Sequence, residues 1–206
     1  YWDRKYNRVP DLLVIEGPKA GGHLGFTKEQ LEVFDDAEYN KEVKSILKAV
    51  REYEKKYERK IPVVLAGGID TKEKVEAAMA LGVDGVQTAS RFVTTEECDA
   101  DIRYKEAYIN AREEDICIVT SPVGMPGRAI LNPFMKRVMD GEKFTPKKCL
   151  GCLQKCNPAE IPYCITERLV AAARGDVEEA LLFCGKEAYR QQKITTVREV
   201  IGSLMG

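Results

Sequence analysis

Three short apolar runs, separated by helical patterns, constrain this chain more than any other feature. The runs span residues 11–16, 61–66 and 84–88. Short β-branched runs bounded by glycine are typical of buried strands. The segments between them, 40–56 and 71–81, carry apolar residues at the helical period, and Gly82 follows the second as a helix-ending glycine. This alternation predicts βαβ units and a parallel sheet.

From Glu96 onward the pattern changes, and we expect a mainly helical region without further strands. The predicted helices span residues 101–113, 129–139, 166–174, 177–191 and 197–204. Residues 119–128 and a cysteine-bearing segment, 148–164, are predicted loops. The chain therefore divides into an α/β part, 1–95, and a helical part, 96–206. Three parallel strands cannot close a barrel, which needs eight. They could form a small open sheet, but its edges would need covering, so we expect a fragment of a longer chain whose first half is missing.

Composition excludes several classes of protein. The 206 residues carry a net charge of −1, which attracts neither nucleic acid nor an anionic membrane. No apolar run is long enough to span a bilayer. Seven cysteines, an odd number, argue against a fully paired secreted framework. Reduced thiols or metal ligands fit better, and we expect a cytoplasmic protein.

The carboxyl ends of the three predicted strands carry unusual residues. The second strand runs into Gly67 and Gly68, and the third into residues 87–91, Gln-Thr-Ala-Ser-Arg. Glycine N–H groups approach a phosphate closely, and a helix N-terminus favours an anion. In barrels the loops after the last two strands commonly form a phosphate site. The alternative is a tight Gly-Gly turn followed by Ser90 as a helix cap.

His23 is the single histidine, and it follows two glycines at the end of the first predicted strand. Imidazole titrates near neutrality, so it can act as a general base or donate a hydrogen bond to a developing anion. A lone histidine is also often structural, and position alone leaves both readings open.

Three segments together resemble the nitronate monooxygenase family, which also includes the flavin-dependent enoyl-acyl carrier protein reductase II. Residues 20–23 read Ala-Gly-Gly-His, and residues 62–69 read Pro-Val-Val-Leu-Ala-Gly-Gly-Ile. Residues 82–92 read Gly-Val-Asp-Gly-Val-Gln-Thr-Ala-Ser-Arg-Phe. The order and spacing of all three match the family, closely over about residues 11–128 and more loosely beyond.

The resemblance implies a (β/α)₈ TIM barrel that binds flavin mononucleotide (FMN), of which this chain carries the last three strands. It implies that His23 is the catalytic base or hydrogen-bond donor beside the flavin. The implied cofactor-binding residues are Gly21, Gly22, Ala66, Gly67, Gly68, Gln87, Thr88, Ala89 and Ser90.

The implied activity is an FMN-dependent oxidoreductase that oxidises alkyl nitronates with O₂ through reduced flavin. One alternative is an enoyl-acyl carrier protein reductase on the same fold, using NAD(P)H. Another is an inactive barrel fragment or a module that binds phosphate or flavin. The expected partner is a small molecule, a nitronate or an enoyl thioester, with a homodimer as a candidate assembly. Lys19 and Arg128 are weaker candidates for the substrate mouth, each with a structural alternative.

Four cysteines, Cys149, Cys152, Cys156 and Cys164, lie in one predicted loop with the spacing C-x2-C-x3-C-x7-C. Four thiolates bind zinc tetrahedrally or hold a [4Fe–4S] cluster. The first pair resembles the cluster motif of iron–sulfur relatives of old yellow enzyme, which are flavin barrels too. The alternative is a set of reduced, partly buried thiols. Cys98, Cys117 and Cys184 are predicted core residues.

Overall fold

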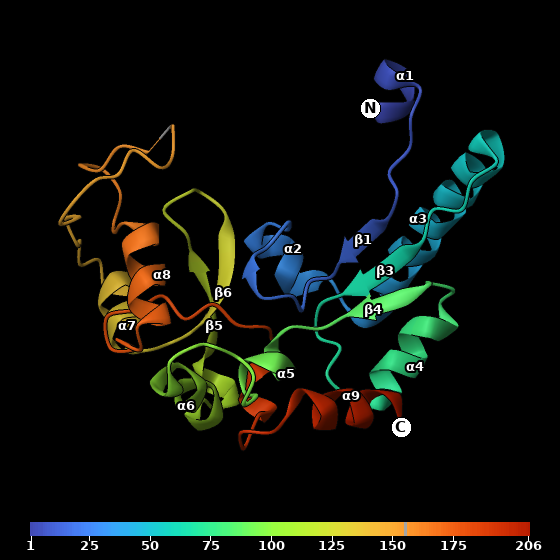
Figure 1. Cartoon of the computed structure of the whole chain (residues 1–206). Helices are drawn as coiled ribbons and strands as arrows, with labels where there is room; N and C mark the ends of the chain where they lie inside the picture. Colours follow the sequence, from blue (N-terminus) through green and yellow to red (C-terminus); the bar gives the residue numbers. More distant parts are fainter. Residues whose placement is uncertain (155) are drawn as a thin grey trace.

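The computed structural model describes residues 1–154 and 156–206 (Figure 1). Lys155, part of the predicted cysteine loop, lies outside the described residues. The first half contains, in order, α1 (Trp2–Tyr6), β1 (Leu13–Glu16), β2 (Gly22–His23), α2 (Lys28–Val33), α3 (Asp36–Tyr57), β3 (Val63–Ala66), α4 (Lys72–Ala80), β4 (Gly85–Gln87) and α5 (Ser90–Val93). The second half contains α6 (Ile102–Asn110), the 3-10 turn η1 (Glu113–Asp115), β5 (Ile116–Thr120), β6 (Pro126–Ile130), α7 (Pro133–Met139), α8 (Ile165–Ala173), the 3-10 turn η2 (Ala188–Arg190) and α9 (Val197–Met205).

The three predicted strands form a parallel sheet in the order β1-β3-β4, which confirms the βαβ prediction. Helices α3, α4 and α9 pack against it and share one hydrophobic core with its strands. The most deeply buried members, Val43, Val63 and Val200, come from α3, β3 and α9. Apolar side chains at the helical period thus meet alternate side chains of the strands, as a two-layer packing requires.

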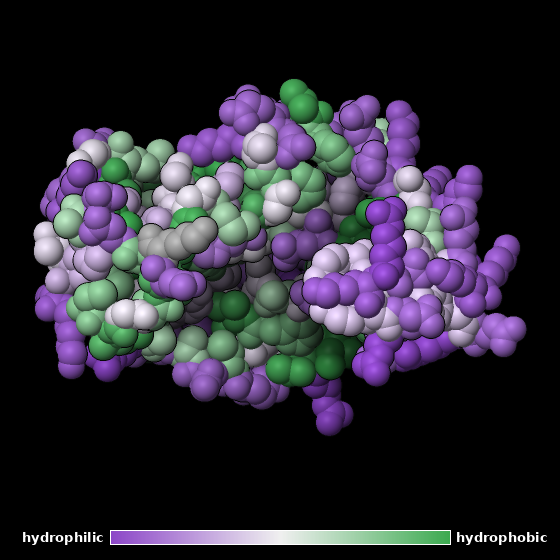
Figure 2. All heavy atoms as spheres, turned by 90° about the horizontal axis from the view of Figure 1, so that it is seen from above, coloured by the Kyte–Doolittle hydropathy of each residue, from purple (hydrophilic) through white to green (hydrophobic). Residues whose placement is uncertain are grey.

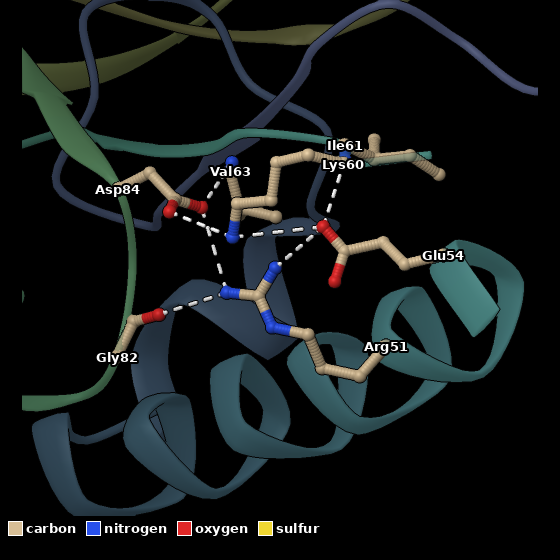
Figure 3. A network of polar contacts seen from close by, with 7 residues as sticks. All are labelled: Arg51, Glu54, Lys60, Ile61, Val63, Gly82 and Asp84. Carbon is tan, nitrogen blue, oxygen red and sulfur yellow. Dashed lines mark hydrogen bonds and ion pairs between the residues drawn. The ribbon is translucent and has the colours of Figure 1, made fainter. Parts of the chain in front are cut away.

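A polar network fixes the end of α3 against the start of β3 and the turn before β4 (Figure 3). The Arg51 guanidinium donates to the carbonyl oxygen of Gly82 at 3.2 Å and lies 3.4 Å from the Asp84 carboxylate. Asp84 in turn accepts the main-chain N–H of Val63 at 2.9 Å. Glu54, Lys60 and Ile61 complete the network. Exposed ion pairs contribute little singly, so the network serves to hold the strand ends in register.

One face of the parallel sheet is not covered by helices. Along β1, Leu13 and Ile15 face the core, whereas Val14 is 43% exposed and Glu16 is also exposed. Gln87 at the end of β4 is exposed as well. Parallel sheets are normally covered on both faces, so this bare face is an unusual feature of the fold.

A second sheet corrects the prediction of a mainly helical second half. Strands β5 and β6 form an antiparallel hairpin, and β2 joins β6, with Gly22 opposite Arg128 and His23 opposite Gly127. The predicted loop 119–128 is the end of β5, a turn and part of β6. The predicted helix 129–139 begins only at Pro133, after β6 has ended.

The predicted helix over 177–191 is also wrong. Apart from η2, the described residues of this segment are irregular, and Phe183 makes an isolated antiparallel bridge to Ala129 of β6. Only residues 181–185 form a short extended segment beside β6, where the N–H of Ile130 donates to the Leu182 carbonyl and the N–H of Cys184 donates to the Arg128 carbonyl. Its buried residues, Leu181, Leu182 and Cys184, join the two hydrophobic clusters of the second half.

No helix among the described residues is long and apolar enough to cross a membrane. Seen from above, hydrophobic surface gathers toward the middle of the molecule, hydrophilic side chains dominate the right-hand end, and the left-hand end is mixed (Figure 2).

Candidate active site

A cavity of ≈ 210 Å³ lies beyond the carboxyl ends of β1, β3 and β4. All nine residues predicted to bind the cofactor line it: Gly21, Gly22, Ala66, Gly67, Gly68, Gln87, Thr88, Ala89 and Ser90. They come from three separate strand ends, which the parallel topology brings to one edge of the sheet. The bare face of the sheet reaches the same place, because Glu16 and Gln87 also line the cavity.

Gly67 and Gly68 form a glycine loop at one wall of this cavity. Their φ angles are +99° and +74°, a left-handed conformation that favours glycine. A Cβ added at Gly67 would lie 3.0 Å from the main-chain nitrogen of Ala20 and 3.1 Å from the carbonyl oxygen of Gly17. The loops after β1 and β3 therefore touch backbone to backbone. Two successive left-handed glycines expose main-chain N–H groups of the kind that cradle anions.

Ser90 links this edge to the extended segment after α8. The main-chain N–H of Gly185 donates to the Ser90 hydroxyl at 3.1 Å, and both residues line the cavity. Ser90 is the first residue of α5 and not its cap, since Ala89 occupies the N-cap position, and α5 has only four residues. The helix dipole at this end is correspondingly small, so the glycine loop and the hydroxyls are the stronger anion-binding groups.

His23 lies on β2, beside this cavity rather than in a free loop. Its Nε2 atom is 2.8 Å from the Ser121 hydroxyl, and Ser121 is only 2% exposed. The imidazole packs edge-to-face on Phe183, with ring centroids 5.1 Å apart. Phe183 also lines the cavity and fits there because Gly127 has no side chain: a Cβ would meet the Phe183 ring at 2.9 Å. The histidine is thus held on two sides.

Four residues of this site escaped the sequence interpretation: Tyr108, Ser121, Phe183 and Gly185. The hydroxyl of Tyr108 donates to the carbonyl oxygen of Phe183 at 2.5 Å, which fixes the segment that faces the glycine loop. A usable signal was Gly185, which is out of place inside a predicted helix, after the apolar run 180–184. Ser121 carried no signal, because its partner lies 98 residues away in the chain.

Lys19 and Arg128 both have structural partners. Lys19 forms an ion pair of 2.7 Å with Asp36, although it also lines the cavity. Arg128 is only 6% exposed, and its guanidinium donates to the carbonyl oxygen of Ala20. Burial lowers the pKa of Arg128. Its contact supports the loop that carries the two glycines before His23.

Cys184 provides a test of how closed this site is. It lies in the cavity wall, 3% exposed, and burial raises the pKa of its thiol to about 12. At pH 8 its thiolate fraction is then about 10⁻⁴, against roughly a quarter for an ordinary thiol. We expect iodoacetamide to leave Cys184 unmodified in the native protein and to label it fully in urea, as read by peptide mass spectrometry. Equal labelling in both states would show that the cavity wall is open.

The sequence matches the family model for nitronate monooxygenase over residues 4–206. The chain belongs to the nitronate monooxygenase family. This match confirms the resemblance seen in the three motifs. It also extends through the second half of the chain, where the resemblance was looser.

Individual relatives of this nitronate monooxygenase family member support the same family assignment. A Staphylococcus saprophyticus protein named "Probable nitronate monooxygenase" is 29% identical over 137 residues, which are 66% of this chain and 36% of that protein. The structure of FabK from Thermotoga maritima is 26% identical with a TM-score of 0.66, covering 95% of this chain and 53% of that one. The structure of a nitroalkane oxidase from Streptomyces ansochromogenes is 24% identical with a TM-score of 0.62, and the match covers 94% of this chain and 51% of that one. It shows a shared fold.

The chain therefore spans about a third of the length of the curated relative and about half of the solved structures.

The four clustered cysteines of this family member lie apart from the cavity at the strand ends. All four line a second cavity of ≈ 630 Å³ between the 149–164 segment and α8. All seven cysteines of the chain are free thiols, and Cys149 and Cys152 are exposed. Burial raises the pKa of Cys156, and the nearby thiols of Cys149, Cys152 and Cys164 add to that effect. Among the described residues, no three ligating side chains lie close enough together to hold a metal ion.

Proposed function

We propose that this chain carries the phosphate-binding and histidine side of an FMN-dependent oxidoreductase of nitronate monooxygenase type. The observation that carries the proposal is the convergence of nine residues from three strand ends on one cavity beside His23. The substrate in this proposal is a small alkyl nitronate, which O₂ oxidises through reduced flavin.

The three parallel strands correspond, in this proposal, to the last three of a (β/α)₈ barrel. The support is the uncovered face of the sheet, which carries Val14, Glu16 and Gln87. In a closed barrel that face is the packed interior, and the helices α3 and α4 lie outside, as they do here. The cavity then lies at the carboxyl-terminal face of the barrel, where barrel enzymes place their active sites.

The residues present fit FMN. The left-handed pair Gly67 and Gly68 offers main-chain N–H groups, and Thr88 and Ser90 offer hydroxyls, which together suit a phosphate monoester. Gly21 and Gly22 also line the cavity. A Cβ at Gly22 would meet nothing within 4 Å, so a planar ring can approach the backbone there, whereas the space beside Gly21 is filled by the backbone of Cys184 and Gly185. Bound flavin supplies the electron-transfer chemistry that no side chain of this cavity provides.

His23 acts on the substrate in this proposal, either as base toward a carbon acid or as hydrogen-bond donor to a nitronate oxygen. Ser121 is a positioning residue, because its hydroxyl holds Nε2 and thereby the orientation of the ring. Phe183 excludes water from one side of the imidazole. An imidazole that is oriented in this way and shielded from water on one side interacts more strongly with a developing charge.

The visible spectrum of the purified protein and two assays test the proposal. We expect flavin absorbance, and oxygen uptake when an alkyl nitronate is added. The same-fold alternative, an enoyl reductase, predicts instead that NAD(P)H reduces an enoyl thioester and that nitronate has no effect. A protein that binds flavin but shows neither activity would be a flavin-binding module, and a colourless protein that takes up no added FMN would overturn the assignment altogether.

Replacing Ser121 with alanine tests the positioning role. The net worth of one hydrogen bond, about 0.5–1.5 kcal/mol, predicts a fall in kcat/KM of about 2- to 10-fold. Ser121→Thr keeps the hydroxyl and is expected to restore most of the rate. The pH profile of kcat/KM should move in Ser121→Ala and not in Ser121→Thr, since the former alone leaves the ring without its partner. If Ser121→Ala and Ser121→Thr had the same pH profile and the same kcat/KM, the Ser121 hydroxyl would not position His23.

A further inference from the structure

The second cavity is not used by the proposed flavin chemistry, and its wall contains four of the seven cysteines. Cys149, Cys152, Cys156 and Cys164 fall within sixteen residues and face one space of ≈ 630 Å³. In Figure 1 this segment lies beyond α8, at the opposite end of the molecule from the parallel sheet. The other three cysteines, Cys98, Cys117 and Cys184, do not line this cavity.

The fourth cysteine is firmly placed. Cys164 occupies the N-cap position of α8, between the fully buried Tyr163 and the buried Ile165. The Cys152 sulfur lies 3.3 Å from the hydroxyl of Thr166 in the first turn of the same helix. The first segment of the cluster therefore already folds back onto the helix that begins with Cys164.

The remaining two cysteines are joined to Cys152 by turns of the main chain. The N–H of Cys156 donates to the carbonyl oxygen of Leu153 at 3.2 Å. Gly151, with φ of +62°, turns the chain between Cys149 and Cys152. Between α7 and α8 the described residues contain no helix or strand. Drawing the exposed thiols inward therefore moves loop backbone and breaks no regular element, so the ligands can gather when a metal centre binds.

The spacing distinguishes between two kinds of thiolate centre. Structural zinc sites usually use two short-range ligand pairs, one from each of two turns. Here three cysteines fall in the eight residues 149–156, and the fourth stands alone eight residues later. Three clustered cysteines with a more distant fourth is the arrangement typical of iron–sulfur clusters.

Basic side chains also border the space. Lys147, Lys148 and Arg174 line it without a carboxylate partner among the described residues. Glu167, Asp176 and Glu179 line it too, and the carboxylate of Glu179 is paired with Arg137 and Arg168. Four thiolates carry more negative charge than a cluster core offsets, and neighbouring cations stabilise the excess. With Arg168 included, four basic side chains and three acidic ones line the cavity, which leaves a small excess of positive charge beside the thiols.

We propose that Cys149, Cys152, Cys156 and Cys164 bind a [4Fe–4S] cluster in the cavity beside α8. Cys156 also lines the neighbouring cavity, to which Ser121 contributes. The cluster would thus order the loop that borders the side of the molecule where Ser121 holds His23. This site goes beyond the flavin chemistry and does not depend on it.

The test is the iron and acid-labile sulfide content of the full chain, purified without oxygen and again after reconstitution with ferrous iron and sulfide. We expect about four of each per chain, with broad visible absorbance that dithionite bleaches and an electron paramagnetic resonance signal in the reduced protein. About one zinc per chain and no sulfide would overturn the cluster, as would the absence of bound iron after reconstitution.

Single variants assign the ligands. Cys156→Ser and Cys164→Ser are each expected to lower iron from about four to below about one per chain. Cys98→Ser, a partly exposed thiol outside the cavity, is the matched control and should keep the full content. Full iron in all the tetrad variants would overturn the proposal. Flavin released from the same samples is measured separately, so a protein with flavin and no cluster, or the reverse, identifies which proposal has failed.

Discussion

Replacing His23 with alanine is expected to lower kcat/KM by about 10²- to 10⁴-fold while the flavin stays bound. The expected size follows from the loss of a group that donates or accepts a proton at the substrate. Flavin should remain, because the residues that fit its phosphate lie on β3, β4 and the loops after them, and none of them contacts the imidazole through a hydrogen bond. The change also leaves Phe183 without its edge-to-face partner, which costs stability but not the cavity.

Steady-state rates, flavin content and thermal unfolding of the His23→Ala and His23→Gln variants separate these effects. Glutamine keeps a polar group in place of the ring, so a role limited to packing or to a hydrogen bond with Ser121 would be partly restored by it. A proton-transfer role would not. A rate within about threefold of wild type in either variant would mean that His23 is structural. Loss of flavin together with activity would instead place the histidine in cofactor binding.

The sequence predicted the parallel sheet because its signals are local. The runs 11–16, 61–66 and 84–88 are apolar and end in glycine or small polar residues, and the helices between them have caps such as Thr27 and Thr71. Each of these features can be read within ten residues of chain. The strand ends around Gly67, Gly68 and Ser90 could be predicted for the same reason, since parallel strands bring their carboxyl ends to one edge. The other cofactor residues, Gly21, Gly22, Ala66 and Gln87, were implied by the resemblance to the family.

The antiparallel sheet could not be predicted in the same way. Strand β6 begins Pro-Gly-Arg, which is turn chemistry by composition, and Pro126 is tolerated because it is the first residue of the strand. Gly127 is required there by the ring of Phe183, more than fifty residues later. The run 116–120, Ile-Cys-Ile-Val-Thr, was a usable strand signal, but the glycine and proline that follow it also fit a loop. Long-range packing decided between the two.

The same contrast holds within the candidate site. Glycines at strand ends could be predicted, but the residues that hold them could not. The segment 183–186 reaches the glycine loops only through tertiary contacts, and these contacts make Gly21 the most constrained glycine of the cavity. A Cβ at Gly21 would lie 2.6 Å from the carbonyl carbon of Cys184 and 2.7 Å from the main-chain nitrogen of Gly185.

The backbone of residues 183–186 cannot move away from Gly21 at low cost, because hydrogen bonds hold this segment on both sides. The N–H of Cys184 donates to the Arg128 carbonyl at 3.1 Å, and that of Lys186 to the Lys19 carbonyl at 3.1 Å. The N–H of Gly185 donates to the Ser90 hydroxyl, so any shift of this segment disturbs a residue that the proposal places at the flavin phosphate. A methyl group at residue 21 would displace Gly185, and through the Gly185–Ser90 hydrogen bond it would affect cofactor binding.

Gly21→Ala is therefore expected to lower the free energy of unfolding by about 1–3 kcal/mol, the usual cost of overpacking, and to weaken FMN binding by about tenfold or more. Gly25→Ala is the matched control four residues further along the chain, just after β2: its Cβ would meet nothing within 4 Å, and its φ lies outside the left-handed region. Denaturant unfolding gives the first quantity and fluorescence titration of the flavin-free protein with FMN gives the second. If Gly21→Ala matched Gly25→Ala in both, the segment 183–186 would not pack on the glycine loop. If it lost stability alone, the flavin phosphate would lie away from Ser90.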